Sequence, residues 1–140
     1  MSNRVGFIRE VLSILEQYSI SVEHIPSGID SFSVVVNRED VKQNIHEIIA
    51  KIKTTMDPDV IRLTDPFALI ATVGRNMYSR PGTAARLFTA LGDAGINVRM
   101  IAQGSAELNI IVGVDNRDLE KAIRCLYNTF NTDTPRTETR

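Results

Sequence analysis

Two short turns that contain glycine stand directly before amphipathic segments, and both have the composition of an anion site. They are Val5-Gly6-Phe7-Ile8 and Arg80-Pro81-Gly82-Thr83. The first backbone N–H groups of a helix have no acceptor within the helix, and the helix dipole places partial positive charge there. A glycine lets a ligand approach this bare backbone closely. The residues therefore predict two turns that suit a carboxylate, each at the amino terminus of a helix.

The helices that follow the two turns are predicted from their apolar spacing. Apolar residues recur at i, i+3, i+4 and i+7, which is the period of a half-buried helix. They are Ile8, Val11, Leu12 and Leu15 in the first helix, and Ala84, Leu87, Phe88 and Leu91 in the second. Pro81 is expected in the first turn of the second helix, and Gly95 is expected to end it in the left-handed conformation.

Short apolar runs between the helices predict strands. They cover residues 20–26, 32–36, 98–102 and 108–114, and the last run alternates with a period of two. Residues 67–73 are the most strand-like segment and a candidate for a central position, and residues 60–63 predict a further short strand. Asn37, followed by two acids, predicts the start of another helix, which Asp57-Pro58 ends. Residues 115–130 predict a fourth amphipathic helix.

The two halves of the chain repeat each other, which indicates a duplication. At a constant offset of 76 residues Gly6 coincides with Gly82, Gly28 with Gly104, and Val36 with Val112. The offset becomes 78 at the next helix, where Val41 coincides with Leu119. Each half then has a βαββαβ layout with its helices on one face of an antiparallel sheet. The predicted fold class is α+β, with two tandem ferredoxin-like units.

Each predicted unit is one strand short. Residues 1–64 form the first unit, whose first strand would precede Met1. Residues 65–131 form the second unit, whose last strand would fall in the polar tail 132–140, which is expected to be disordered. A sheet that lacks a strand leaves its edge unpaired. We therefore expect a piece of a longer polypeptide, or a chain that completes its sheets in a homodimer or higher assembly.

The composition is that of an ordinary globular chain. Its 140 residues are 43% apolar and 24% charged, with a net charge of −1 and interspersed signs. This balance argues against a nucleic-acid or membrane partner. The apolar runs are far shorter than the roughly 20 residues that span a bilayer, and no signal peptide is visible. With Cys125 as the single cysteine, neither a disulfide framework nor a thiolate metal site is expected. These features predict a cytoplasmic protein.

Both halves resemble a known family. The segment RPGTAARLFTALGDAGINVRMIAQGSAELNI is similar to the second ACT domain of aspartate kinases, which phosphorylate aspartate to start lysine, threonine and methionine synthesis. The segment NRVGFIREVLSILEQYSISVEHIPSGIDSFSVVV resembles the first ACT domain of the monofunctional bacterial form that lysine and threonine regulate. The resemblance covers about residues 3–130. It implies the C-terminal regulatory region of an aspartate kinase, which senses L-lysine, L-threonine or both for feedback control.

The resemblance also implies partners. In that family an amino-terminal kinase domain holds ATP and magnesium, and its phosphate-binding start has no counterpart in this sequence. We therefore expect no cofactor and no aspartate kinase activity from this chain alone. The expected partners are the effector amino acid, a second copy bound through the ACT units, and the kinase domain of the parent polypeptide.

ACT domains bind free amino acids where the strand-to-helix turn of one unit faces another unit. Glu23 matches the acidic position that such enzymes use for a lysine side chain, and residues 96–98 match a segment that reaches the effector in threonine-binding relatives. The same resemblance leaves open which amino acid binds. The predicted effector-binding residues are Asn3, Gly6, Phe7, Ile8, Glu23, Ser27, Gly28, Ile96, Asn97 and Gln103.

Other classes of function compete with a regulatory module. An RNA-binding domain shares the βαββαβ layout, but its central strands need stacking aromatic residues, and the runs here are aliphatic. An acylphosphatase-like enzyme needs a phosphate-binding loop, and neither that loop nor a nucleophile–base pair is visible. The alternative that stays open is a dimerisation module without a working ligand site, in which Glu23 only faces solvent.

Overall fold

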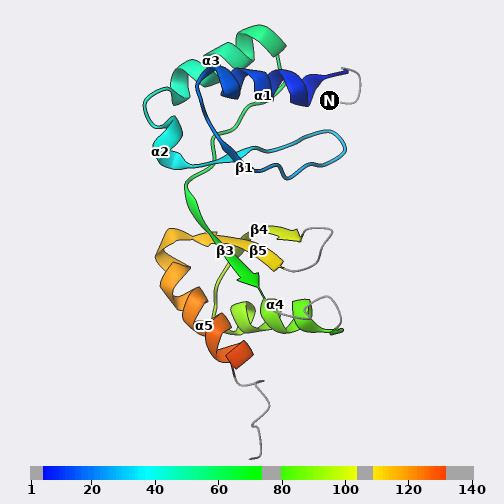
Figure 1. Ribbon diagram of the computed structural model, residues 1–140, viewed down its shortest axis with the longest axis vertical. Coiled ribbons are helices and arrows are strands. Elements are labelled where there is room, and N and C mark those ends of the chain that lie inside the picture. The colour runs from blue at the N-terminus through cyan, green and yellow to red at the C-terminus, as the bar shows by residue number, and fades with distance from the viewer. Residues whose placement is uncertain (1–4, 74–79, 104–108, 132–140) are drawn as a thin grey trace, which may run out of the picture. The chain divides into compact units, whose positions relative to one another are not determined.

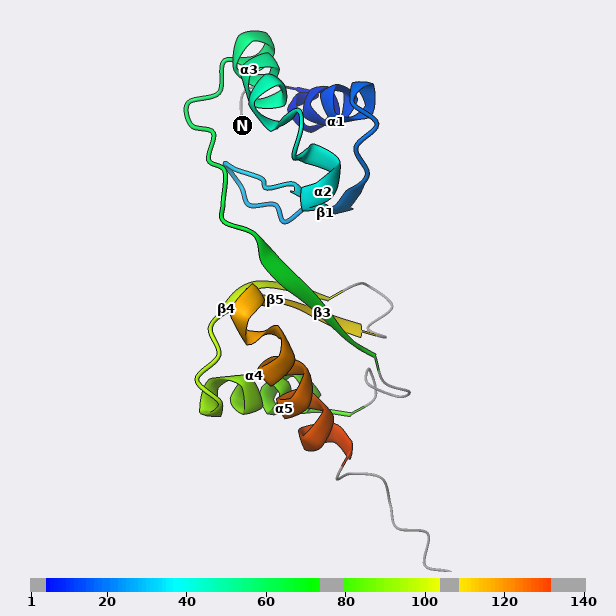
Figure 2. The same cartoon turned by 90° about the vertical axis from the view of Figure 1, so that its left-hand side faces the viewer.

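The computed structural model describes residues 5–73, 80–103 and 109–131 (Figure 1). The chain divides into two compact units, Met1–Thr64 and Asp65–Arg140. In each unit the helices cover one face of an antiparallel sheet (Figure 2), so the α+β fold class predicted from the sequence is confirmed. The predicted disordered tail lies outside the described residues. No helix in the described part of the chain is long and apolar enough to cross a membrane.

The described part of the first unit contains three helices and a two-stranded sheet. Its elements are α1 (Phe7–Gln17), β1 (Val22–His24), β2 (Val35–Val36), α2 (Arg38–Val41) and α3 (Ile45–Met56). The strands pair in antiparallel fashion, and an isolated bridge between Ser27 and Phe32 continues the hairpin. Asn37 caps α2 as predicted, since its side chain accepts a hydrogen bond from the Glu39 N–H at 3.0 Å.

Over residues 65–73, 80–103 and 109–131, the second unit packs two long helices on a three-stranded sheet. Its elements are β3 (Phe67–Val73), α4 (Thr83–Asp93), β4 (Val98–Gln103), β5 (Asn109–Asp115), the short 3₁₀ helix η2 (Asn116–Asp118) and α5 (Leu119–Asn131). The strand order is β3-β5-β4, and both pairs are antiparallel. Within the described sheet β5 is therefore the central strand, and β3, the predicted candidate for that place, lies at an edge.

Each unit has its own apolar core. The first core is centred on residues of α1 and α3, with Val11, Ile14, Leu15 and Ile48 all buried. In the second core Leu87 and Leu91 of α4 and Val112 and Val114 of β5 have no exposed surface. These residues occupy periodic apolar positions of the sequence. In α1 and α4 their burial is expected, because packing of its apolar face is the main source of stability for an amphipathic helix.

Helices α1 and α4 begin and end with the same backbone geometry. Gly6 and Gly82, which precede them, are left-handed, with φ of 82° and 88°. At the other end Ser19 and Gly95 are left-handed, with φ of 57° and 71°. Each is followed by an isoleucine whose N–H bonds to the carbonyl oxygen five residues earlier, which is the Schellman ending. The predicted role of Gly95 is confirmed, and the duplication holds at the level of the backbone.

Strand pairing corrects the sequence alignment of the two halves. Val22 pairs with Val36 in the first unit, whereas Val98 pairs with Val114 in the second. The first strands are thus offset by 76 residues (98 − 22) and the second strands by 78 (114 − 36). The predicted match of Val36 with Val112 was wrong by two residues. The extra residues fall in the hairpin connection, because such loops tolerate insertions that a paired strand does not.

Three further predictions differ from the structure. Residues 60–63 are not a strand, because a strand needs a neighbour and none lies beside them in the described part of the first unit. The helix expected after Asn37 is broken between Val41 and Ile45, where Asn44 leaves the helical conformation with φ of −119°. Pro81 lies before the helix instead of in its first turn, since Gly82 is the cap.

Candidate functional site

The amino terminus of α1 presents backbone N–H groups without a side-chain cap. Gly6 precedes the helix, its carbonyl oxygen accepts from the Glu10 N–H at 3.0 Å, and no described side chain caps the first turn. Among the described residues, the nearest atom that a Cβ on Gly6 would meet is Arg9 Nε at 3.7 Å. Glycine is therefore required at this position by its left-handed backbone, and space for a ligand remains. The N–H groups that follow, of Phe7 and Ile8, suit an anion.

The turn after β1 lies at the same end of the first unit. Ser27 is bridged to Phe32, and the Phe32 ring meets the Phe7 ring edge to face, with centroids 5.5 Å apart. The Gly28 N–H donates to the Ser31 carbonyl oxygen at 2.7 Å, which closes the turn. The two phenylalanine rings thus join the start of α1 to this turn. Gly6, Phe7 and Ile8 and the exposed Ser27 and Gly28 are brought together as one end of the unit.

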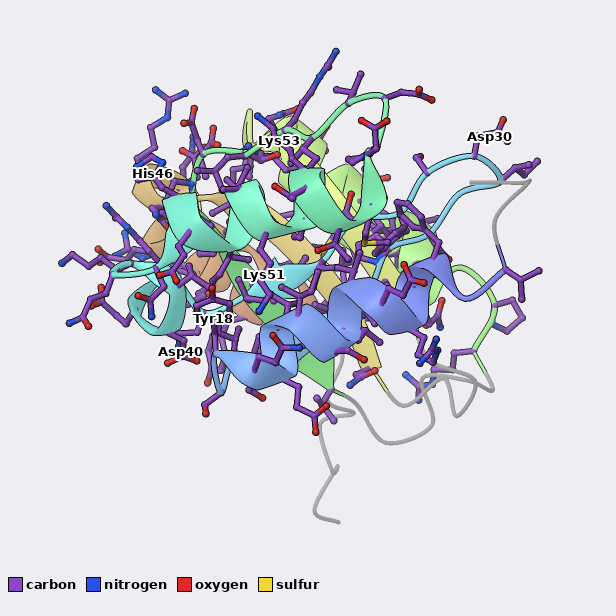
Figure 3. The ribbon with its side chains drawn as sticks, turned by 90° about the horizontal axis from the view of Figure 1, so that it is seen from above. Tyr18, Asp30, Asp40, His46, Lys51 and Lys53 are labelled. Carbon is purple, nitrogen blue, oxygen red and sulfur yellow. The ribbon has the colours of Figure 1, made fainter. Side chains whose placement is uncertain are left out.

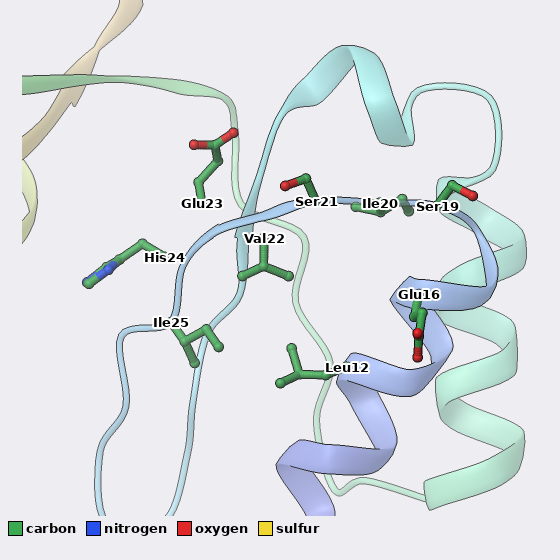
Figure 4. Close-up of a pocket in the computed structure, with 9 residues that line it drawn as sticks. All are labelled: Leu12, Glu16, Ser19, Ile20, Ser21, Val22, Glu23, His24 and Ile25. Atoms are coloured by element: carbon green, nitrogen blue, oxygen red, sulfur yellow. The ribbon is translucent and has the colours of Figure 1, made fainter.

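Glu23 lies further along the unit, at an open cleft between α1 and β1. The cleft has a volume of about 770 Å³, and its lining comes from α1 and from residues 19–25. The side chains of Leu12, Val22 and Ile25 point toward one another inside the cleft. The side chain of Glu23 leaves its strand on the opposite side from Val22 and points away from them (Figure 4). Leu12 lies five residues beyond Phe7, which is about 7.5 Å along a helix. A ligand that contacts both the α1 terminus and Glu23 must therefore extend along the helix.

Sequence reasoning missed part of this cleft. Glu16 lines it from α1, and Ser19, Ser21 and His24 line it from the chain that follows. The signal for Glu16 was available, because residues four apart lie on the same helix face and Leu12 is four residues earlier. Glu16 and Glu23 are both exposed, with Glu16 on the α1 side of the cleft and Glu23 on the face of β1 that points away from the apolar lining. Among the described residues, no group of three histidine, cysteine or acidic side chains is placed to hold a metal ion.

The carboxyl end of α1 is tied to α3 by polar contacts. Lys51 lies beside Tyr18 (Figure 3), with its Nζ 5.6 Å from the ring centroid, and it also bonds to Gln17. Partial desolvation raises the pKa of Tyr18, and a hydrogen bond to Glu47 and the charge of that carboxylate raise it further. These contacts attach the carboxyl end of α1 to α3.

The remaining predicted residues belong to the second unit or lie outside the description. Ile96 is 5% exposed and belongs to the second core, so only its backbone is available to a ligand. Asn97 and Gln103 are exposed, and Gln103 pairs with Ile110 as Ser27 pairs with Phe32. Asn3 lies outside the described residues.

The second unit does not reproduce the acidic position. The residue equivalent to Glu23 is Arg99, and its Nη1 bonds to Asp115 Oδ1 at 3.1 Å. The two copies therefore share a glycine-capped helix terminus, but their charges at this strand position are opposite. Only the first unit offers a free carboxylate here within the part of the chain that the structure describes.

Comparisons with known proteins agree with this geometry. Residues 70–130 match the model of the ACT domain. Aspartokinase 3 of Bacillus subtilis is 34% identical over 131 residues, which are 93% of this chain and 29% of that protein. The chain thus spans less than a third of the length of this curated relative.

Two solved structures have the same fold. The aspartate kinase of Clostridium acetobutylicum matches with a TM-score of 0.90 and 46% identity, over 94% of this chain and 30% of that one. The regulatory subunit of aspartate kinase from Thermus thermophilus matches with a TM-score of 0.76 and 26% identity, over 91% of this chain and 84% of that one. The likeness to the second protein extends over most of both chains.

Proposed function

This chain belongs to the aspartokinase family as an ACT-domain regulatory region, and we propose that it binds a free amino acid, L-lysine or L-threonine, as a feedback effector. The observation that carries the proposal is the uncapped, glycine-led amino terminus of α1, which is joined to the Ser27 turn through Phe7 and Phe32. An α-carboxylate fits such a terminus, because it neutralises the partial positive charge of the helix dipole.

The two acidic side chains near the cleft favour lysine of the two candidates. Glu23 and Glu16 are exposed carboxylates beyond the α1 terminus, and an extended side chain with a terminal ammonium group is needed to reach them. The apolar residues Leu12, Val22 and Ile25 would contact the methylene groups of a chain that reaches toward Glu16, whereas Glu23 would be approached from the other face of β1. Threonine is too short to use both parts of the site, and it would rely on the terminus and the Ser27 turn.

The site is proposed to be completed by another ACT unit. Asn97 and Gln103 are exposed polar residues on the second unit, and they would meet the amino group or side chain of the ligand from a facing unit. A homodimer supplies such units, and the unpaired outer edges of β1 and β4 offer backbone groups for the contact within the described sheets. Light scattering at micromolar concentration tests this step, and a folded monomer under those conditions contradicts it.

The regulatory effect follows from linkage. An effector that binds one arrangement of the paired units more tightly than another shifts the population toward it, and the kinase domain responds through the same equilibrium. In this proposal ATP and magnesium belong to that kinase domain, and the parent protein acts on aspartate in the cytoplasm. The coupling is reciprocal, so substrates that favour the active arrangement weaken effector binding.

Calorimetry with L-lysine and L-threonine tests the proposal directly. Glu23→Gln removes a charge-assisted contact that is worth roughly 1.5–3 kcal/mol, so the lysine affinity should fall about ten- to a hundredfold. Threonine affinity should change much less. Glu120→Gln on the exposed face of α5 is the matched control, and it should leave both affinities unchanged.

A second pair of variants tests the carboxylate position. Gly6→Val should abolish binding of both amino acids, because valine is strained at φ of 82° and its branches cover the helix terminus. Gly82→Val imposes the same backbone strain in the second unit, where a Cβ would meet no described atom within 4 Å, and it should spare binding. If neither amino acid gives binding heat or a melting shift at millimolar concentration while the chain is dimeric, a dimerisation module without a ligand site replaces this proposal.

A further inference from the structure

One corner of the second unit joins all three strands through a single side chain. Phe67 is the first residue of β3 and pairs with Asp115, the last residue of β5. Arg99 of β4 bonds to Asp115 at 3.1 Å, and its Cζ lies 5.2 Å from the centroid of the Phe67 ring. The guanidinium therefore contacts a carboxylate from one neighbouring strand and an aromatic ring from another.

The corner is closely packed and partly shielded from water. The side chains of Arg99 and Asp115 are 21% and 31% exposed, so their pairing is screened less than that of a surface pair. The Phe67 ring lies directly on the backbone of Gly113, because a Cβ there would be 2.6 Å from Phe67 Cε2. Gly113 is thus required by the ring, and the ring is fixed between the glycine and the guanidinium.

The corner is absent from the first copy of the duplicated unit. By strand pairing, the positions of Arg99, Gly113 and Asp115 correspond to Glu23, Val35 and Asn37. Glu23 cannot pair with Asn37 as an ion pair, and Val35 leaves no bare backbone for a ring. The corner is therefore not a general requirement of this fold, and a role specific to the second unit must account for it.

What distinguishes the second unit at this corner is the linker. Residues 57–66 connect the two units without a described helix or strand, and Val60 and Leu63 in it are 66% and 67% exposed. The linker ends at Pro66, next to Phe67. We propose that Arg99 is a positioning residue that anchors Phe67, and so fixes the point and direction in which the linker enters the second unit.

The anchor gives the linker a mechanical role. A conformational change in the first unit can pass along the chain to β3 only if Phe67, where the linker enters the strand, keeps its position. In this proposal the contact between the Phe67 ring and Arg99 keeps Phe67 on the sheet. This consequence rests on the proposed function, because it is the effector that would change the first unit. The anchoring itself does not depend on any ligand, so the two can be tested separately.

Hydrogen exchange of the ligand-free 140-residue chain tests the anchor. Arg99→Met keeps much of the stem and removes both the ion pair with Asp115 and the cation–π contact with Phe67. Loss of the cation–π contact should speed exchange at residues 67–69 about tenfold. Exchange at Leu87 and Leu91 in the core should stay unchanged. Arg99→Lys keeps the charge opposite Asp115 and should restore part of the protection. Arg124→Met, which breaks the exposed pair with Glu120 on α5, is the matched control without effect.

Two results overturn the inference. One is exchange at residues 67–69 that is unchanged in Arg99→Met and in Gly113→Ala, which displaces the Phe67 ring. The other is equal acceleration throughout the second unit, because that shows general destabilisation instead of local anchoring. Repeating the measurement with saturating L-lysine separates the two proposals. Where lysine binds, it should alter exchange at residues 67–69 in the native chain and not in Arg99→Met. If lysine does not bind, the effector proposal fails, and the hydrogen-exchange rates of the ligand-free chain still test whether Arg99 anchors Phe67.

Discussion

The matching ends of α1 and α4 allow a reciprocal test of backbone strain. Ser19 and Gly95 occupy the same left-handed position of two Schellman endings, with φ of 57° and 71°. Their N–H groups bond to Glu16 O at 2.9 Å and Gly92 O at 3.0 Å, so the hydrogen bonding is the same in both. The two sites differ in the residue type, and serine carries a Cβ that the left-handed region disfavours.

The magnitude follows from this difference. A left-handed conformation costs a residue with a Cβ about 1–2 kcal/mol, and glycine loses part of the advantage through its greater freedom in the unfolded chain. Ser19→Gly should therefore stabilise the first unit by about 0.5–1 kcal/mol, and Gly95→Ser should destabilise the second by about 1 kcal/mol. A Cβ at Gly95 would meet nothing within 4 Å, so no clash contributes.

Thermal unfolding followed by circular dichroism and calorimetry measures both changes. For a unit of this size 1 kcal/mol corresponds to a shift of about 4–8 °C in Tm. Gly92→Ala provides the control, because Gly92 lies inside α4 with helical φ and open space, and the substitution should stabilise by about 0.5–1 kcal/mol. Equal signs for Ser19→Gly and Gly95→Ser, or a neutral Gly95→Ser, would refute the reasoning from backbone conformation.

Two further predictions concern the cores and the α1–α3 contact. Because the pKa of Tyr18 is raised, its contribution to stability is complete below the ordinary value of 10.0 and is lost as the pH rises through the folded-state pKa. Urea midpoints measured through this alkaline range should decline less in Tyr18→Phe than in the native chain, and equal declines would contradict the assignment. Leu87→Ala removes a side chain with no exposed surface, and it should cost about 2.7–5 kcal/mol in urea unfolding. Ile123→Ala, at a position that is 50% exposed on the neighbouring helix, should cost far less.

Elements with a strong local period were predictable from the sequence. The strand at residues 67–73 and the helices after Gly6 and Gly82 lie where the pattern placed them. In the two helices the central repeating residues, such as Leu15 and Leu91, are the ones that the cores bury, whereas Ala84 at the start of the second stripe is exposed. Local sequence and tertiary packing therefore select the same structure over most of each helix.

Features that depend on distant neighbours were not predictable in the same way. Residues 60–63 have the composition of a strand, but pairing is a property of two segments, and the described first unit supplies no second one. The two-residue shift between Val36 and Val112 was hidden because a shift of two keeps every side chain on the same face of the sheet. An apolar pattern with a period of two is unchanged by that shift, and only the pairing reveals it.

The candidate site stays a prediction, and the sequence signals covered its start better than its length. Gly6 and the Ser27 turn were predicted from the glycine signals and the resemblance. Glu16 was not predicted, and it was recognised only from its place in the lining of the cleft. Arg99 gave no signal at all in the sequence, because its partners Phe67 and Asp115 come from other strands.

The duplication explains why the two copies differ where they do. The amino termini of α1 and α4 have the same backbone geometry at Gly6 and Gly82, so both copies present backbone N–H groups in an arrangement that suits an anion. The strand position that decides what else a ligand can contact then carries opposite charges. In the first copy Glu23 is exposed and available to an ammonium group, whereas in the second Arg99 is held by Asp115 and Phe67. A cation cannot be recruited next to a fixed guanidinium without repulsion. In the two proposals made above, this position serves recognition in one unit and attachment of the linker in the other, and exchanging the two charges should impair both units instead of creating a second site.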